Sequence, residues 1–201
     1  KRLRDVFRRA DVLHRGRAVD AAHHARQRLA RANFPELGDA LGDHELDRLA
    51  PAHRTGHLLD QPADAIVNAW NRNVIPWWLL IPQGVSGAIK RRAGYAPFRE
   101  LGYRPLPLGD ARHTSAGRLP LRGIIHVAAI DMLWRASEDS VERSTRSALA
   151  MASAHGYRTL AMPLLGSGSG GLSPARSERV MTEMLERAIE MDVTLVRFAK
   201  G

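Results

Sequence analysis

The feature that most constrains the fold of this chain is an alternation of short β-rich runs with amphipathic helical segments beyond residue 52. Runs of Val, Ile, Leu and Thr typical of strands occur at residues 64–69, 123–128, 158–162 and 193–198. Residues 138–155 place apolar side chains on one helix face and stop at Gly156, while Ser173 and Pro174 are typical of a helix start. This alternation predicts an α/β fold, with a largely parallel sheet covered by helices on both faces.

The first fifty residues follow a different pattern. Apolar side chains recur at helical spacing from Leu3 to Leu13, and residues 36–49 continue as a helix-forming stretch between two prolines. We therefore expect a helical N-terminal extension over residues 1–51 and a second domain over residues 52–201. Residues 1–31 hold ten basic and three acidic side chains within a chain of net charge +9. These helices either bind nucleic acid or present a solvated arginine-rich face, and the sequence leaves both open.

The amino-acid composition excludes several kinds of functional site. The chain has no cysteine, which excludes a disulfide scaffold, a thiolate nucleophile and a cysteine-ligated metal centre. Its longest apolar stretch, residues 74–82, is far shorter than the roughly 20 residues of a membrane helix, and no signal-like segment opens the chain. We expect a soluble cytoplasmic protein with no membrane partner, no metal and no cofactor.

A run of very small residues lies between the third β-rich run and the helix at Pro174. It consists of Gly166, Ser167, Gly168, Ser169, Gly170 and Gly171. Such a loop lets the backbone approach a ligand closely, and its successive N–H groups suit an anion such as a diphosphate. It lacks the ending of an ATP-binding P-loop and the spacing of a dinucleotide-binding turn. The alternative is a flexible surface loop.

The first β-rich run leads into two carboxamides, Asn68 and Asn71. An Asn side chain both donates and accepts hydrogen bonds, which suits the hydroxyls of a sugar. Asn68 serves equally well as a structural cap of the turn, and the sequence does not decide between the two roles. A second glycine-bordered helix entrance follows at Gly84, Val85, Ser86 and Gly87, where helix N–H groups again suit phosphate.

Five segments, in order along the chain, match the motifs of one known family. They are D-A-I-V-N-A-W-N at 64–71, G-V-S-G-A-I at 84–89, G-D-A at 109–111 with L-P at 119–120, I-H-V at 125–127, and the stretch from M-P to the glycines at 162–171. Through these segments the chain resembles the macro domain, the ADP-ribose-binding module, and the resemblance covers about residues 52–199. The resemblance implies a three-layer α/β/α domain with a mixed sheet.

The resemblance also implies what each site residue does. The diphosphate of ADP-ribose would lie between the turn at Val85–Gly87 and the glycine loop, and the distal ribose near Asn71. Phe198 would stack on adenine, or else close the core. The implied ligand-binding residues are His57, Leu58, Asn68, Asn71, Gly84, Val85, Ser86, Gly87, Gly166, Ser167, Gly168, Ser169, Gly170, Gly171 and Phe198. The implied catalytic positions are Asn71 and Ser86.

Three departures from the family pattern affect this interpretation. His57 stands where the family usually has an aspartate that accepts a hydrogen bond from adenine. It is either a ligand contact or a structural residue. Ser86 replaces the aspartate associated with hydrolysis, and a serine without a base is not itself a general base. An insertion after Asn71 carries Trp77 and Trp78, which either fill the core or contact the ligand or its carrier.

Three functions therefore compete: an ADP-ribosyl hydrolase, a non-catalytic reader of ADP-ribosylation, and an arginine-rich nucleic-acid-binding protein with a macro-like core. The expected partner is ADP-ribose or an ADP-ribosylated macromolecule. A zinc site at His53 and His57 is a weaker hypothesis, because no third ligand is evident. Asp131 is either a replacement base or, more simply, a helix cap.

Overall fold

The computed structural model describes residues 51–71, 84–186 and 191–198, all within the unit Pro51–Gly201. The predicted helical extension before residue 51 and the insertion with Trp77 and Trp78 lie outside the described residues, so both remain predictions. In the described part of the chain, no helix has the length and hydropathy needed to cross a membrane.

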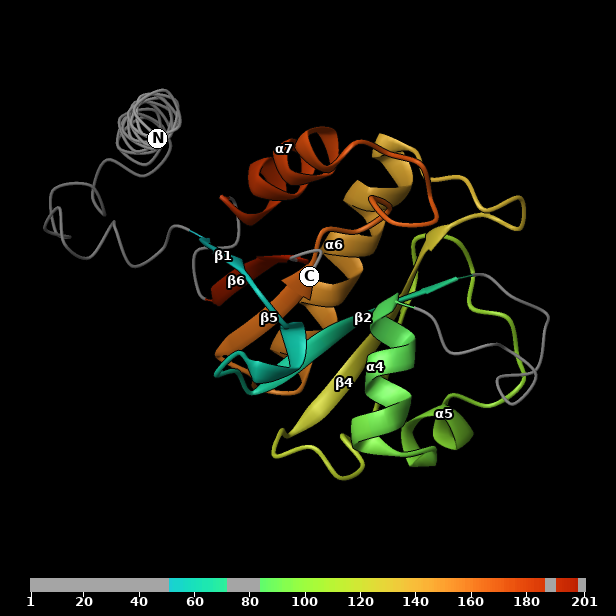
Figure 1. The fold of residues 1–201 in the computed structure, drawn as a ribbon, viewed down its shortest axis with the longest axis vertical. Coiled ribbons are helices and arrows are strands. Elements are labelled where there is room, and N and C mark those ends of the chain that lie inside the picture. Colours follow the sequence, from blue (N-terminus) through green and yellow to red (C-terminus); the bar gives the residue numbers. More distant parts are fainter. Residues whose placement is uncertain (1–50, 72–83, 187–190, 199–201) are drawn as a thin grey trace, which may run out of the picture. The chain divides into compact units, whose positions relative to one another are not determined.

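Six strands form one sheet in the order β1-β6-β5-β2-β4-β3 (Figure 1). The strands are β1 (Ala52–Thr55), β2 (Ala65–Asn71), β3 (Ala111–Thr114), β4 (Gly123–Ile130), β5 (Thr159–Pro163) and β6 (Asp192–Arg197). Neighbouring strands run parallel except β3, which pairs antiparallel with β4. The prediction of a largely parallel, mixed sheet is confirmed. The four predicted runs became β2, β4, β5 and β6.

Helices cover both faces of the sheet because its central strands alternate between two apolar clusters. Helices α4 (Gly84–Ala93) and α5 (Ala96–Leu101) pack on one face, where Ile66 and Ile124 are buried with Ile89 and Phe98. Helices α6 (Glu138–Ala154) and α7 (Pro174–Leu185) pack on the other, against Val67 and Ile125. Strands buried on both sides carry nearly continuous apolar runs, as in β4, where every residue is buried and only His126 is polar. The three-layer α/β/α architecture is thus confirmed.

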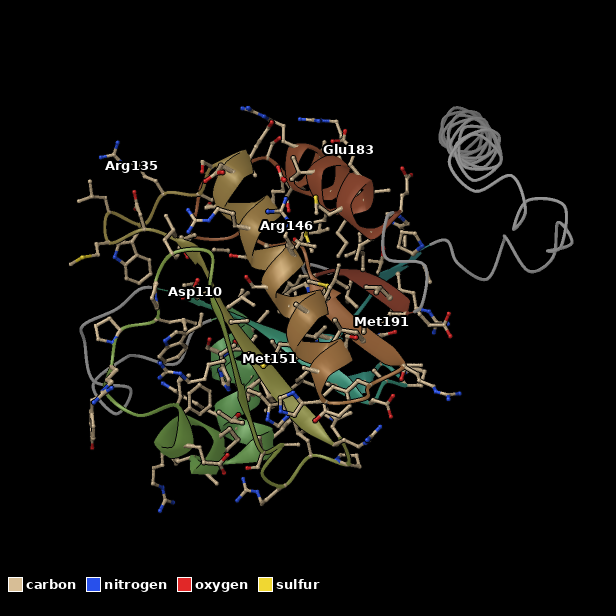
Figure 2. The ribbon with its side chains drawn as sticks, turned by 180° about the vertical axis from the view of Figure 1, so that it is seen from behind. Asp110, Arg135, Arg146, Met151, Glu183 and Met191 are labelled. Carbon is tan, nitrogen blue, oxygen red and sulfur yellow. The ribbon has the colours of Figure 1, made fainter. Side chains whose placement is uncertain are left out.

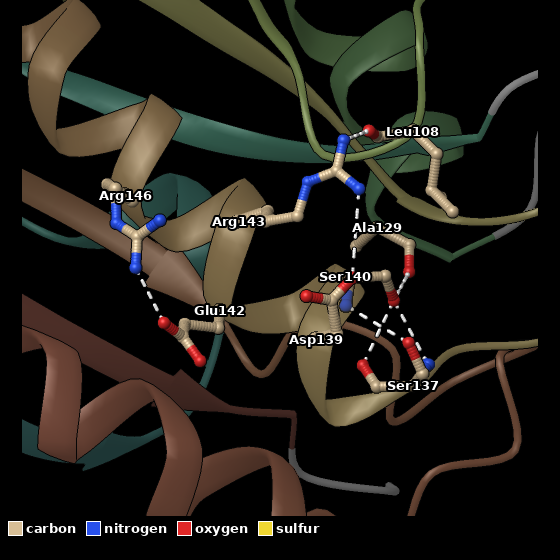
Figure 3. A network of polar contacts seen from close by, with 8 residues as sticks. All are labelled: Leu108, Ala129, Ser137, Asp139, Ser140, Glu142, Arg143 and Arg146. Carbon is tan, nitrogen blue, oxygen red and sulfur yellow. Dashed lines mark hydrogen bonds and ion pairs between the residues drawn. The ribbon is translucent and has the colours of Figure 1, made fainter.

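Local capping signals position the helices that follow the strands. At the start of α6, Ser137 and Ser140 form a reciprocal capping box (Figure 3). Ser140 Oγ also donates to the Ala129 carbonyl at 2.8 Å, which ties this helix to the end of β4. The same helix ends just before Gly156, at φ 63°, and Ser173 caps α7 through the Arg176 amide, as predicted.

Candidate functional site

The sheet opens between β2 and β5 at its carboxyl edge, the edge at which the parallel strands end. These strands pair in register only at Ala65–Leu160 and Ile66–Ala161, although β2 continues to Asn71 and β5 to Pro163. The chain leaves β2 through α4 toward β4 and β3, whereas it leaves β5 through α7 toward β6. Because the connections diverge here, this is the switch point at which open α/β sheets bind ligands.

The glycine loop after β5 is held against the loop that follows β4. A Cβ atom on Gly166 would lie 2.6 Å from Ala136 Cβ, and one on Gly170 would lie 2.6 Å from Ile130 Cγ2. The Ala136 amide also donates to the Gly170 carbonyl at 2.9 Å. Glycine is required at these positions by packing, so the alternative of a freely flexible surface loop does not fit the structure.

The tip of this loop keeps its main chain available. Gly168 and Ser169 are exposed, and a Cβ on Gly168 or Gly171 would meet nothing within 4 Å. Within the described residues, the amides of Gly168, Ser169 and Gly170 donate to no backbone carbonyl. Unengaged amides in a turn bordered by glycine form a concavity suited to an anion. The side chain of Ser167, in contrast, is engaged within the protein, because its hydroxyl donates to the Leu164 carbonyl at 2.8 Å.

The second glycine-bordered junction is the start of α4, as predicted. Gly84 has φ 53°, a left-handed conformation, and Val85, Ser86 and Gly87 form the first helical turn after it. The N–H groups of a first turn have no partner within their own helix. The glycine loop directly follows β5, and the start of α4 contacts β2 through the hydrogen bond from Ser86 to Asn68, so both junctions lie beside these two neighbouring parallel strands.

Ser86 is joined to a buried chain of polar side chains. Its hydroxyl donates to Asn68 Oδ1 at 2.9 Å, and Asn68 Nδ2 lies 2.9 Å from His126 Nδ1. On the other side of the ring, His126 Nε2 lies 2.9 Å from Thr114 Oγ1. Asn68 and His126 are fully buried, so the carboxamide of Asn68 serves this chain inside the protein. Neither Thr114 nor His126 is among the predicted site residues, although a lone histidine inside the otherwise apolar β4 was a usable signal.

Burial keeps the imidazole of His126 neutral. Desolvation, helped by the positive charges that His113 and Arg112 can carry, lowers the pKa of His126 from 6.5 to about 3. The aromatic rings of Trp70 and Phe98 meet His126 edge-on, with centroids 6.3 and 5.7 Å away. A neutral histidine has one donor and one acceptor nitrogen, so the chain of hydrogen bonds has a definite direction.

The outer strands bring His57 and Phe198 together at the same edge. Phe198 follows β6, His57 follows β1, and their rings meet edge-on with centroids 5.8 Å apart. Phe198 is 65% exposed, so the alternative that it closes the core is wrong. Its neighbour His57 is also exposed, whereas Leu58 is buried among the residues under α4. Asn71 ends β2 opposite Ile130, and only its backbone is described.

Two weaker hypotheses concerned a zinc site at His53 and His57, and Asp131. His53 Nδ1 lies 3.0 Å from Glu178 Oε1, and the described residues contain no cluster that could hold a metal ion. Asp131 does not cap a helix, because Ser137 caps α6. Instead, Asp131 Oδ1 accepts the amides of Leu133 and Arg135, both at 2.8 Å. It thereby fixes the tight loop that carries Arg135 outward (Figure 2).

The fold and this edge define a class of protein: an α/β/α module whose candidate site lies where glycine-bordered junctions follow two diverging parallel strands. The chain belongs to the Macro domain family, whose model matches residues 67–181. It is 33% identical to an uncharacterized protein of Aquifex aeolicus, covering 66% of this chain and 78% of that protein. It is 35% identical to a macro domain-containing protein of Streptomyces coelicolor, covering 71% of this chain and 86% of that one.

Solved structures agree with this assignment. The Trypanosoma brucei macrodomain in complex with ADP-ribose is 25% identical, with a TM-score of 0.64 over 74% of this chain. This chain spans 63% of the length of that trypanosomal chain. The macrodomain of Mycobacterium tuberculosis DarG, at 18% identity and a TM-score of 0.60, shares the fold.

Proposed function

We propose that this protein binds ADP-ribose along the carboxyl edge of its sheet. The observation that carries the proposal is the spatial order of the candidate residues. The strand order β1-β6-β5-β2 places His57 and Phe198 first, the glycine loop next, and Ser86 with Asn71 last. ADP-ribose has the same order of chemical groups: adenine, diphosphate and distal ribose.

Each part of the edge has chemistry suited to its part of the ligand. The exposed ring of Phe198 offers a stacking face for adenine, beside the imidazole of His57. The amides of residues 168–170 and of the first turn of α4 suit the diphosphate, since they carry partial positive charge and need partners. Asn71 at the end of β2 and Ser86 at the start of α4 would meet the distal ribose.

The finer proposal is that the protein removes ADP-ribosyl groups from a macromolecule or small molecule in the cytoplasm. In that reaction, the phosphate contacts would hold the nucleotide while Asn71 orients the ribose beside the scissile bond. A non-catalytic reader is the second candidate. The hydrogen bond from Ser86 to Asn68 favours the reader, because a carboxamide oxygen is not a base and leaves the hydroxyl too weakly basic to deprotonate water.

Calorimetry with free ADP-ribose tests the binding proposal. Heat of binding to a single site is expected, and no heat at millimolar ligand overturns it. Incubation with substrates that carry ADP-ribose on Asp or Glu, Ser, Arg and nucleobases then tests hydrolysis. Release of ADP-ribose from any of them supports the hydrolase, and inertness on all of them leaves the reader.

Nucleic-acid binding through the basic N-terminal residues stays a separate prediction. Such binding would weaken steeply as salt rises, because contacts to phosphates release counterions. ADP-ribose binding at the carboxyl edge depends on few charges and would change much less. A titration of each ligand at two salt concentrations therefore separates the two activities.

A further inference from the structure

The hydrogen bonds beneath Ser86 form a chain with one consistent direction. Thr114 has a single hydroxyl proton, which it donates to the Ser115 carbonyl at 3.1 Å. The 2.9 Å contact between Thr114 Oγ1 and His126 Nε2 then requires the ring nitrogen to be the donor. Because His126 is neutral, its Nδ1 is left as an acceptor, and it accepts a hydrogen bond from Asn68 Nδ2. Asn68 Oδ1 is therefore free to accept from Ser86.

The opposite direction would cost several of these bonds at once. Thr114 would have to leave the Ser115 carbonyl to donate to the ring, and the ring would have to carry its proton on Nδ1. The carboxamide of Asn68 would then have to turn over, so that its amino group faces Ser86. Asn68 and His126 are fully buried and Thr114 is 3% exposed, so water does not replace a lost partner. The chain therefore holds one direction.

We propose that Thr114, His126 and Asn68 are positioning residues that keep the Ser86 proton directed into the protein. Ser86 Oγ then presents only lone pairs to the ligand, and it accepts a hydrogen bond from a hydroxyl of the distal ribose. This inference rests on the proposed function. As an acceptor, Ser86 takes the place of the aspartate that the macro domain pattern has at this position, but without the negative charge. The site thereby selects ligands that have a hydroxyl donor beyond the diphosphate over ligands that end at the diphosphate.

Comparison of ADP-ribose with ADP tests this selectivity, because ADP lacks the distal ribose. Ser86→Ala removes the acceptor and should weaken ADP-ribose binding about 5- to 10-fold, the effect of one hydrogen bond, while ADP binding changes less than about 2-fold. Thr114→Val removes the last member of the chain with little change in volume. It leaves the Nε2 proton without a partner, which favours the reversed direction. Ser86 would then accept a hydrogen bond from Asn68 and turn its own proton toward the ligand. The same selective loss is expected.

Two further variants separate this effect from general damage. Thr114→Ser keeps the hydroxyl and should recover most of the ADP-ribose affinity lost in Thr114→Val. Thr145→Val is the matched control, since Thr145 is a fully buried threonine whose hydroxyl, among the described residues, bonds only the Val141 carbonyl within α6. It should leave the binding of both ligands unchanged. Equal losses for ADP and ADP-ribose in Ser86→Ala or Thr114→Val would overturn the selectivity.

The ring of His126 provides a readout that does not depend on ligand. Side-chain ¹⁵N NMR should show the Nε2–H tautomer in the wild-type protein and a shift toward Nδ1–H in Thr114→Val. A wild-type ring protonated on Nδ1 overturns the proposed direction even if ADP-ribose binds. Absence of both ADP and ADP-ribose binding to the wild type overturns the proposed function instead. If Thr114→Val does not fold, the wild-type tautomer and Ser86→Ala decide the matter.

Discussion

Ile66 and Ala161 form the last registered pair between β2 and β5, and the two strands continue beyond it without pairing. The glycine loop directly follows β5, and the start of α4 contacts β2 through Ser86 and Asn68, so each lies beside one strand of the opening. The loop is held there from behind, through Gly166 and Gly170, by the segment that follows β4. Packing therefore fixes the position of the main-chain amides, which gives the proposed phosphate site its rigidity.

Packing behind the glycine loop predicts a stability effect at Gly170. In Gly170→Ala, the new Cβ would lie 2.6 Å from Ile130 Cγ2 and 2.7 Å from the Gly166 carbonyl oxygen. We expect the free energy of unfolding to fall by about 1–3 kcal/mol, as for other overpacked sites. Gly168→Ala, whose Cβ would meet nothing within 4 Å, should have a much smaller effect. Urea denaturation measures both, and equal stability of the two variants would contradict the packing.

The proposed phosphate site predicts that Gly168→Glu abolishes ADP-ribose binding. The carboxylate would occupy the exposed tip of the loop and repel the diphosphate, which costs several kcal/mol and weakens binding roughly 100-fold or more. The fold should tolerate the change, because the position opens to free space. Ser153→Glu adds the same charge at the exposed far end of α6 and should not affect binding. Normal calorimetric affinity in folded Gly168→Glu would refute the loop assignment.

The exposed ring of Phe198 predicts a loss of affinity without a loss of stability. Phe198→Ala should weaken ADP-ribose binding by roughly 1–3 kcal/mol, the range of a base stacked on an aromatic ring. Little change in melting temperature is expected, because the side chain is 65% exposed. Tyr103→Ala removes another exposed aromatic, from the segment after α5, and serves as the control for calorimetry. Unchanged binding in Phe198→Ala would place adenine elsewhere.

The buried imidazole of His126 predicts that acid destabilises the fold. Its pKa is about 3 in the folded state against 6.5 for the free group, so the unfolded chain binds this proton first as pH falls. Stability is therefore complete above pH 6.5 and declines between pH 6.5 and 3, by up to ~1.4 kcal/mol per pH unit for this proton. His113, whose pKa burial also lowers, acts in the same direction.

Urea unfolding at several pH values measures this decline, and NMR identifies the residue responsible. The C2 proton of His126 should keep its chemical shift down to about pH 4. Titration of that resonance near pH 6.5 would contradict the neutral, buried ring and with it the direction of the hydrogen-bond chain.

The local signals of the sequence predicted the elements that carry their own pattern. Continuous apolar runs identified β2, β4 and β5, and Ser173 with Pro174 identified the start of α7. Such signals are short-range, because a strand buried on both faces or a helix cap is specified by residues a few positions apart. β1 and β3 were missed since neither has that pattern: β1 is exposed throughout, and both contain Arg and His.

The sequence by itself determined the family and the α/β/α architecture. It also identified the two glycine-bordered loops whose main-chain amides suit an anion. Only the tertiary structure decided that Ser86 bonds to Asn68 and, through His126, to Thr114, because these residues come from four elements. Likewise, β1 and β6 lie side by side, so His57 meets Phe198 although the residues are far apart in the chain. The physical reason is that strand order and register decide which distant side chains touch. The type of a single residue does not specify its distant partner.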